Sequence, residues 1–376
     1  MKHLAFLALA AVAFAACEPN HDATAPQASL QRVAQQGDDG GPRAVYTITN
    51  QVAGNAVAVF ARAADGTLTA AGSFATGGTG TGAGLGSQGA VTLSNDGRLL
   101  FAVNAGSNDV SVFRVTPEGL SLASRAPSGG VQPISVAVSG SVVYVLNAGG
   151  AGNISGFTAS NSGELTPIPG STKSLSSATA GPAQVSFSPD GRELVVAEKN
   201  TNLLDVYPVD ANGLAGERTS FASAGGTPFG FAFGLHNVLL VSEASAPGSA
   251  SSYTLSRGGV LQLVSGVVVT HQGAPCWAVV TNNGRFGFTG NGSGSVSAFS
   301  IAPDGAIRLV APNGASAVIP GGINDIALSR NSRFLYALQT GSTPGIQAYR
   351  IENDGSLTAL GAVAGLPAGA RGLAAF

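Results

Sequence analysis

GRLLFAVNAG, residues 97–106, is an apolar run that ends at an amide, Asn104, followed by small residues. Equivalent runs recur along the chain: RAVYTITNQ (43–51), GSVVYVLNAG (140–149), GRELVVAEKN (191–200), NVLLVSEAS (237–245), GRFGFTGNG (284–292) and SRFLYALQTG (332–341). Together they make seven copies spaced by about 47 residues, and self-similarity at such a period is typical of a repeat architecture.

Each copy lies within a unit of four short strands. The next strand has an aromatic residue near its end: Phe60, Phe113, Phe157, Tyr207, Tyr253, Phe299 or Tyr349. A polar turn with glycine and a further apolar or alternating stretch come next. Ahead of most copies lies another strand, often opened by proline, as in QPISVAVS (132–139) and GPAQVSFS (181–188). Sheets this small bury both faces only when they stack on one another. We therefore predict an all-β fold, a seven-bladed β-propeller of four-stranded blades.

The two ends of the chain are predicted to close this ring. The first copy lacks a leading strand, because QQGDDGG (35–41) cannot serve as one. The last residues, PAGARGLAAF (367–376), match PGGINDIALS (320–329), with Leu373 aligned with Ile326. The C-terminal strand is therefore expected to join the N-terminal blade as its innermost member. This places a single propeller domain over residues 44–376.

Composition excludes several classes of function. The chain has 376 residues, is 44% hydrophobic and 10% charged, and carries a formal net charge of −2. It contains no run of basic residues, so we expect no nucleic-acid partner. No His/Cys cluster has zinc spacing, and no glycine motif lies in a strand-to-helix context that would bind phosphate. We expect a monomer without a metal or cofactor.

The N-terminus indicates export. Residues 1–16 are predicted to be a signal peptide, because Lys2 precedes LAFLALAAVAFAA (4–16), which is too short to span a bilayer. Small residues before Cys17 resemble a bacterial lipobox, so Cys17 is expected to carry lipid; plain cleavage after Ala16 is the alternative. The remainder of 17–43 is predicted to be a flexible tether. The protein would then be a periplasmic or cell-surface lipoprotein, held at the membrane by its lipid anchor only.

Lipidation of Cys17 leaves Cys276 without a disulfide partner. Cys276 lies in an apolar strand, APCWAVV (274–280). A thiol in such a strand is more often an inert part of the core than a nucleophile.

The blade pattern, with SPDGR (188–192), SNDGR (94–98) and aromatic-ending strands followed by DG, resembles the lactonase family of seven-bladed propellers. That family includes 6-phosphogluconolactonases and 3-carboxymuconate cyclase-like proteins. The resemblance covers essentially the whole of 44–376. It implies hydrolysis or formation of a cyclic ester, usually without a metal.

The more diagnostic motifs of that family are altered. It often has Pro-His before a strand and Asp-Leu-Gly-x-Asp after the next strand. The equivalent stretch here is GPAQVSFSPDGRELVVAEKNTN (181–202). Ala183 stands at the histidine position, Glu198 at the first aspartate and Asn202 at the second. Loss of the histidine removes the best general base near neutral pH, so membership is compatible with an absent or altered activity.

Polar residues are predicted to line the mouth of the central channel, where loops from every blade converge. The repeated strands end in Asn50, Asn104, Asn147, Glu198, Glu243, Asn291 and Gln339. The starts of the leading strands add Gln184, Trp277, Asn324, Asp325 and Arg371. We predict ligand contacts for this set. Two alternatives stand beside that prediction: strand-end asparagines often only form turns, and a single tryptophan often only packs between blades.

Three residues of this face are candidate catalysts. His271, in VVVTHQGAPCW (267–277), lies in the loop before the sixth leading strand, and Glu198 and Glu243 depart from the amide pattern. Plainer interpretations are also open: His271 as an ordinary surface histidine, and Glu198 with the adjacent Lys199 as a solvated pair. Arg371 in the closing strand would either orient an anionic ligand or form an ion pair with Asp325.

Two functions remain open at the level of sequence. In the first, an exported hydrolase opens a lactone or a similar cyclic ester, with water activated by His271 or a mouth carboxylate. In the second, a tethered propeller binds a small molecule or an unknown protein partner without catalysis.

Overall fold

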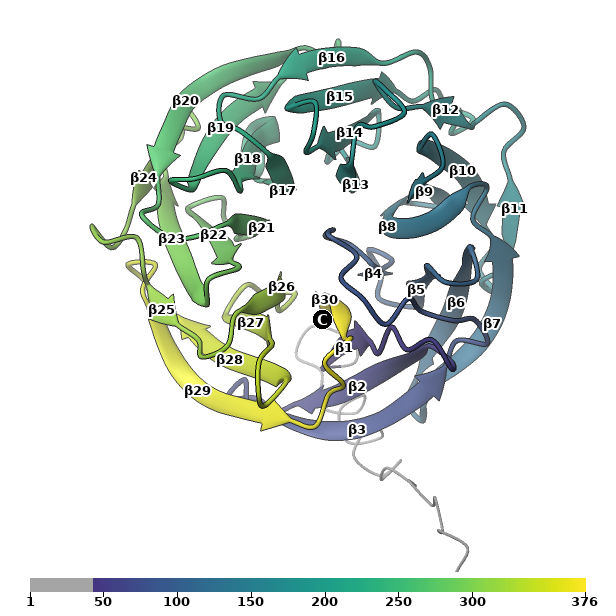
Figure 1. Ribbon diagram of the computed structural model, residues 1–376, viewed down its shortest axis with the longest axis horizontal. Helices are drawn as coiled ribbons and strands as arrows, with labels where there is room; N and C mark the ends of the chain where they lie inside the picture. Colours follow the sequence, from purple (N-terminus) through teal and green to yellow (C-terminus); the bar gives the residue numbers. More distant parts are fainter. Residues whose placement is uncertain (1–42) are drawn as a thin grey trace, which may run out of the picture.

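Residues 43–376 are described by a computed structural model, and they form seven β-sheets arranged radially around a central channel (Figure 1). The predicted signal peptide, Cys17 and nearly all of the predicted tether lie outside the described residues. The all-β, seven-bladed architecture is confirmed. In every blade the innermost strand borders the channel and the later strands follow outward.

The first four blades have these strands. Blade 1 contains β30 (Arg371–Ala375), β1 (Ala44–Ile48), β2 (Ala56–Arg62) and β3 (Leu68–Ala75). Blade 2 contains β4 (Val91–Leu93), β5 (Leu99–Asn104), β6 (Asp109–Thr116) and β7 (Gly119–Pro127). Blade 3 contains β8 (Val131–Ser139), β9 (Val142–Gly149), β10 (Asn153–Ala159), β11 (Leu165–Pro167) and β12 (Lys173–Ser174). Blade 4 contains β13 (Pro182–Phe187), β14 (Glu193–Glu198), β15 (Leu203–Pro208) and β16 (Thr219–Ala222).

The other three blades complete the ring. Blade 5 contains β17 (Pro228–Phe233), β18 (Val238–Glu243), β19 (Ser249–Leu255) and β20 (Leu261–Val269), with the short 3-10 helix η1 (Leu235–Asn237) between its first two strands. Blade 6 contains β21 (Pro275–Val280), β22 (Phe286–Asn291), β23 (Ser295–Ile301), β24 (Ile307–Leu309) and β25 (Ala317–Val318). Blade 7 contains β26 (Ile323–Leu328), β27 (Phe334–Gln339), β28 (Gly345–Ile351) and β29 (Leu357–Ala364). In blades 3 and 6 the outermost strand is split into two short pieces.

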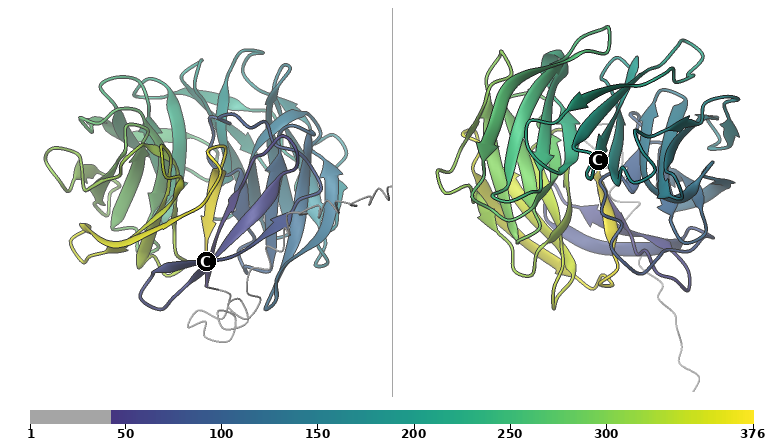
Figure 2. Two further views of the ribbon diagram at one scale, coloured as in Figure 1. Left: turned by 60° about the horizontal axis from the view of Figure 1, so that its bottom comes forward. Right: turned by 45° about the horizontal axis from the view of Figure 1, so that its top comes forward.

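The predicted ring closure is confirmed. Strand β30 pairs antiparallel with β1, and Figure 2 shows it, in yellow, beside the purple strands of blade 1. The Phe376 N–H donates to the Ala44 carbonyl at 3.0 Å, and the Arg62 guanidinium donates to the Phe376 carbonyl oxygen at 3.0 and 3.2 Å. The Phe376 ring then contacts blade 2, where a Cβ on Gly97 (φ +71°) would lie 2.3 Å from it. Glycine is required there for both conformation and space.

The second strands form the core, because they are buried on both faces. All six residues of β5, β14, β18 and β22 are buried, which explains the near-continuous apolar runs of the repeats. Full burial of one such large apolar side chain contributes about 1.5–3 kcal/mol. Stacking of the blades therefore stabilises the ring as a whole, and no blade buries these strands alone.

The ring has two unlike faces. On the upper face the second strands end and the inner strands begin; on the lower face the inner strands turn into the second strands. The connection from β3 to β4 differs from the others because its residues 77–89, here called the plug, run across the upper opening of the channel. Figure 1 shows this dark segment reaching the middle of the ring beside β4.

Candidate functional site

The side chains that end the second strands are anchors for connecting segments. Six of them are completely buried: Asn50, Asn104, Asn147, Glu198, Glu243 and Asn291. They do not face the open mouth as the sequence suggested, because each points into hydrogen-bonding groups of its own blade or of a connection that crosses it. Gln339 is half-buried and donates to Thr343 at 3.3 Å.

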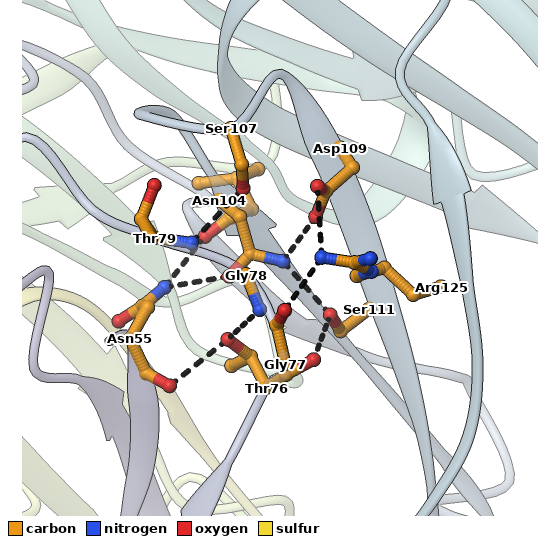
Figure 3. Close-up of polar contacts among 11 residues, drawn as sticks. Asn55, Thr76, Gly77, Gly78, Thr79, Asn104, Ser107, Asp109, Ser111 and Arg125 are labelled. Atoms are coloured by element: carbon orange, nitrogen blue, oxygen red, sulfur yellow. Dashed lines mark hydrogen bonds and ion pairs between the residues drawn. The ribbon is translucent and has the colours of Figure 1, made fainter. Parts of the chain in front are cut away.

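Asn104, the residue that ends the run GRLLFAVNAG, holds the start of the plug (Figure 3). Its Nδ2 donates to Asp109 at 2.6 Å and Ser111 at 2.8 Å, while its Oδ1 accepts from Asn55 at 2.9 Å. A Cβ on Gly78 would lie 2.5 Å from the Asn104 amide, so the chain passes directly over it. Asn104 therefore positions the first residues of the plug.

Asn50 performs the same task further along the plug. Its Oδ1 accepts the Thr81 N–H at 2.9 Å and its Nδ2 donates to the Ala83 carbonyl at 2.7 Å. In blade 3, Asn147 Nδ2 donates to the Ser128 carbonyl of the segment that leads into β8. In blade 6, Asn291 Nδ2 bonds Ser295 and Ser297 at 2.9 Å. These contacts agree with the alternative interpretation, in which the strand-end asparagines hold turns and connections instead of binding a ligand.

The two predicted catalytic glutamates lie in closed networks. Glu198 accepts from Ser176 N at 2.8 Å and from Thr201 Oγ1 at 2.6 Å. Glu243 accepts from the Gly225 N–H at 2.7 Å and from Ser249 Oγ at 2.5 Å. A buried carboxylate whose oxygens are already bonded stabilises its loop but has no open side for a reacting water.

Side chains in the channel join neighbouring inner strands. Gln184 Nε2 donates to the Phe231 carbonyl at 3.0 Å, and its Oε1 accepts the Phe231 N–H at 2.7 Å. Gln88, from the plug, makes the same pair of bonds with Ala278, at 2.8 and 2.9 Å. Gly230 lies in β17, the inner strand of blade 5, which stands between blades 4 and 6. A Cβ added to Gly230 would lie 2.1 Å from Gln88 Oε1. Gly230 thus leaves the space through which Gln88 reaches blade 6.

Trp277 and Asp325 also make hydrogen bonds within the propeller. The Trp277 indole is 7% exposed, packs edge-on against Phe229 and donates to the Ser87 carbonyl at 3.0 Å. Asp325 is buried, and its Oδ2 accepts the Leu373 N–H at 3.0 Å, which ties the closing strand to blade 7. Burial raises the pKa of Asp325 well above its usual value. Arg371 forms no ion pair with it in residues 43–376.

Several inner strands begin with β-bulges, which change the direction of the side chains at the upper face. The register shifts around Ile134 in β8, Ala183 in β13, Cys276 in β21 and Asn324 in β26. Bulges re-aim side chains and are common next to functional sites. Ile134 and Ala183 are fully buried, whereas Cys276 and Asn324 are half-exposed. Among these four bulge residues, the open part of the upper face therefore lies at blades 6 and 7.

Lys199 borders this open part. Its Nζ donates to the Gly86 carbonyl at 2.6 Å and the Pro182 carbonyl at 2.8 Å, and lies 5.0 Å from the centre of the Phe229 ring. Burial lowers the pKa of Lys199 to about 8. Burial also raises the pKa of the nearby Cys276 thiol to about 12, which agrees with an unreactive cysteine.

Arg371 also lies beside the plug. Its Nη1 donates to the Ala368 and Ala370 carbonyls at 3.1 and 2.6 Å, and a Cβ on Gly84 would lie 3.8 Å from its Nη2. A Cβ on Gly86 would lie 3.3 Å from Lys199 Nζ. The two cations therefore flank positions only two residues apart in the plug. We call Lys199, Phe229, Cys276, Asn324 and Arg371 the cationic arc.

The cationic arc carries no acidic counterpart. Within residues 43–376, no carboxylate lies within ion-pair distance of Lys199 or Arg371, and both bond only backbone carbonyls. An arrangement of two uncompensated cations favours an anion or a polarised ester oxygen. His271 is exposed on the loop before β21, with its backbone at φ +57°.

The sequence analysis missed the plug, Gln88 and Gly230, and it left open whether Lys199 forms a solvated pair with Glu198 or belongs to a site. The available signal was the length and glycine content of ATGGTGTGAGLGSQGA (75–90), which exceeds every other connection into an inner strand. Glycines inside strands often mark a close approach of other groups, which is the role of Gly230 in β17.

Comparison with known proteins agrees with the seven-bladed fold. A family model described as "Lactonase, 7-bladed beta-propeller" matches residues 42–173 and 129–232, about half of the chain. The chain belongs to this family. This lactonase-family propeller matches no curated protein sequence significantly.

Several solved structures share the fold of this lactonase-family propeller. The periplasmic gluconolactonase of Pseudomonas aeruginosa is 17% identical, with a TM-score of 0.69 over 88% of this chain and 98% of the other. A protein of Bacteroides uniformis described provisionally as a 6-phosphogluconolactonase is 18% identical, with a TM-score of 0.69 over 88% and 99%. A Lactobacillus plantarum protein is 17% identical, with a TM-score of 0.70 over 88% and 98%.

Two features are absent from residues 43–376. This part of the chain has no group of three or more His, Cys, Asp or Glu side chains placed to hold a metal ion. It also has no helix with the length and apolar character needed to cross a membrane.

Proposed function

We propose that this lactonase-family propeller hydrolyses a lactone at the cationic arc. The observation that carries the proposal is the pair Lys199 and Arg371, two cations beside the plug that have no acidic partner within residues 43–376. Uncompensated positive charge suits the negative charge that develops on an ester oxygen during hydrolysis. It also favours lactones that bear a carboxylate or a phosphate.

Lys199 is the proposed general base. A neutral amine has two N–H donors and one lone pair, and the Gly86 and Pro182 carbonyls use the two donors. Because its pKa is lowered to about 8, a substantial fraction is neutral in mildly alkaline solution. Its lone pair then takes a proton from water as the water oxygen attacks the lactone carbonyl.

Arg371 is proposed to stabilise the resulting oxyanion. When the intermediate collapses, the bond between the carbonyl carbon and the ring oxygen breaks, and the proton held by Lys199 passes to that ring oxygen. The product is an open-chain hydroxy acid, so atoms and charge balance without a further reactant. Asn324, at the bulge of β26, is half-exposed and no side-chain hydrogen bond is found for it in residues 43–376, so its amide is proposed to contact the substrate.

A second candidate function, binding without catalysis, is favoured by a different observation. Glu198 and Glu243 are locked in internal networks, and the plug covers part of the mouth. Under this alternative the same cations retain an anionic small molecule or a protein partner and convert nothing.

The experiment that separates the two uses a panel of lactones that includes gluconolactone and its 6-phosphate, with a pH-indicator readout corrected for spontaneous hydrolysis. Wild type is compared with Lys199→Arg, which keeps the charge and the donors but cannot act as a base near pH 8. Hydrolysis by wild type and its loss in Lys199→Arg support the enzyme. Binding of an anionic lactone with no turnover supports the alternative.

We also propose export as a lipoprotein anchored through Cys17. The proposal rests on the apolar stretch 4–16 and on the small residues before Cys17. A monomeric propeller on a tether would then act outside the cytoplasm.

A further inference from the structure

The lower half of the central channel is a second concave site, separate from the mouth. Two adjoining cavities of about 530 and 360 Å³ lie between the inner strands. They share Gln88, Gln184, Ser186, Val279 and Leu328 among their lining residues, so they form one continuous space, here called the lower channel. Its size is in the range of small-molecule sites.

The plug closes the lower channel from above. The Gln88 side chain bonds Ala278 on blade 6, and the Gln88 N–H donates to the Ala183 carbonyl on blade 4 at 3.1 Å. Ser87 Oγ donates to the Ile134 carbonyl on blade 3 at 2.8 Å. Residues 87 and 88 thus bridge three blades, and a ligand in the lower channel would enter from the lower face.

The charge at the lining of the lower channel is positive only. Neither cavity is lined by an aspartate or glutamate, and the charged residue among their lining is Arg330. Arg330 is exposed at the lower end, with its guanidinium carbon 4.5 Å from the centre of the Phe376 ring. No carboxylate in residues 43–376 lies within ion-pair distance of it. The Asn282 amide donates to the Arg330 carbonyl and fixes the turn that carries it.

Part of the lining of the larger cavity is apolar and aromatic. Phe187 on β13 and Phe233 on β17 line the larger cavity, together with Val279 and Leu328. Flat apolar walls below a roof of amides suit a ring, and a guanidinium at the opening suits a carboxylate, which it can bind through two N–H groups.

We propose that the lower channel binds a small aromatic carboxylate, with its carboxylate on Arg330 and its ring between Phe187 and Phe233. This site is independent of the lactone chemistry proposed for the cationic arc. It uses a different face, different residues and no covalent step.

The test measures binding of phenylacetate and of its uncharged counterpart phenylacetamide to the purified protein by titration calorimetry. The key variant is Arg330→Gln. The matched control is Arg333→Gln, which removes a positive charge from the same connection but does not line the lower channel. Ser186→Leu, which fills the channel, is a second variant, and thermal unfolding verifies that all variants remain folded.

We expect phenylacetate to bind at least about tenfold more tightly than phenylacetamide, and both Arg330→Gln and Ser186→Leu to weaken it by about tenfold or more. Arg333→Gln and Lys199→Gln, which removes the charge at the upper mouth, should bind as wild type does. The proposal is overturned if phenylacetate does not bind at about 10 mM, if the amide binds equally well, or if Arg330→Gln has no effect. A loss in Lys199→Gln would assign the binding to the upper mouth and would also overturn it, whatever the outcome for lactone hydrolysis.

Discussion

Gln88 and Ala278, 190 residues apart, are joined across the channel by two hydrogen bonds, one to each backbone polar group of Ala278. Gly230 makes this possible, because any side chain there would occupy the position of the Gln88 amide. The plug is therefore built into the ring, with anchors on blades 3, 4 and 6.

Gly230→Ala should destabilise the protein by about 1–3 kcal/mol, because its Cβ would lie 2.1 Å from Gln88 Oε1. The measurement is the free energy of unfolding in urea. Gly266→Ala, in the outer strand β20 with no atom within 4 Å of the added Cβ, is the matched control and should change little. Combining Gly230→Ala with Gln88→Ala should recover part of the loss; strict additivity of the two would contradict the contact.

Glu243→Gln should reduce stability and leave lactone hydrolysis per folded molecule unchanged. Its oxygens accept from Gly225, Ser249 and Ser251, and an amide cannot accept all of these bonds. A loss of about 1–3 kcal/mol is expected from urea unfolding. If kcat falls strongly while stability is retained, the glutamate acts in catalysis as the sequence first suggested.

Stability should decrease as pH rises from about 4 towards 7 because of Asp205. Burial first, and then Glu198 nearby, raise the pKa of Asp205 from 3.8 to about 7, against the opposing effects of Ser220 and Arg218. The folded state thus holds a proton that the unfolded chain releases, so raising the pH in this range favours unfolding. Urea unfolding at several pH values should show a decrease of about 1–3 kcal/mol that Asp205→Asn removes. An unchanged slope in Asp205→Asn would assign the effect to other groups.

Cys17 should carry lipid in the mature protein. Mass spectrometry of protein purified from membranes of a bacterial host should give a diacylated or triacylated N-terminal peptide beginning at residue 17. Cys17→Ser should move the protein to the soluble exported fraction. An unmodified N-terminus at residue 17 would instead indicate plain cleavage after Ala16.

The fold was predictable from sequence because the same strand pattern recurs in seven copies. Each copy of the run around Asn104 is a second strand buried on both faces, and the match of Leu373 to Ile326 gave the closure by β30. The site was less predictable, because it depends on contacts between distant residues. The local sequence around a strand-end amide such as Asn104 is the same whether its side chain faces solvent or holds the plug. The plug itself occurs once, so no repeat revealed it.

The position of Lys199 was hidden for a similar reason. In the sequence it follows Glu198 and resembles half of a solvated pair, but the strand ends between them and their side chains separate. Glu198 turns into blade 4 towards Ser176, whereas Lys199 turns to the plug carbonyl of Gly86. The change of its pKa comes from burial, which adjacency in sequence does not report.

Lys199 is proposed to be the general base of a lactonase. The most direct test of this role is the pH dependence of enzymatic lactone hydrolysis, measured for wild type and Lys199→Arg after subtraction of the spontaneous rate. The account predicts that kcat/KM of wild type rises with pH through an apparent pKa of about 8, and that Lys199→Arg loses at least about a hundredfold at every pH. An Lys199→Arg variant that retains the wild-type rate and pH profile would contradict it.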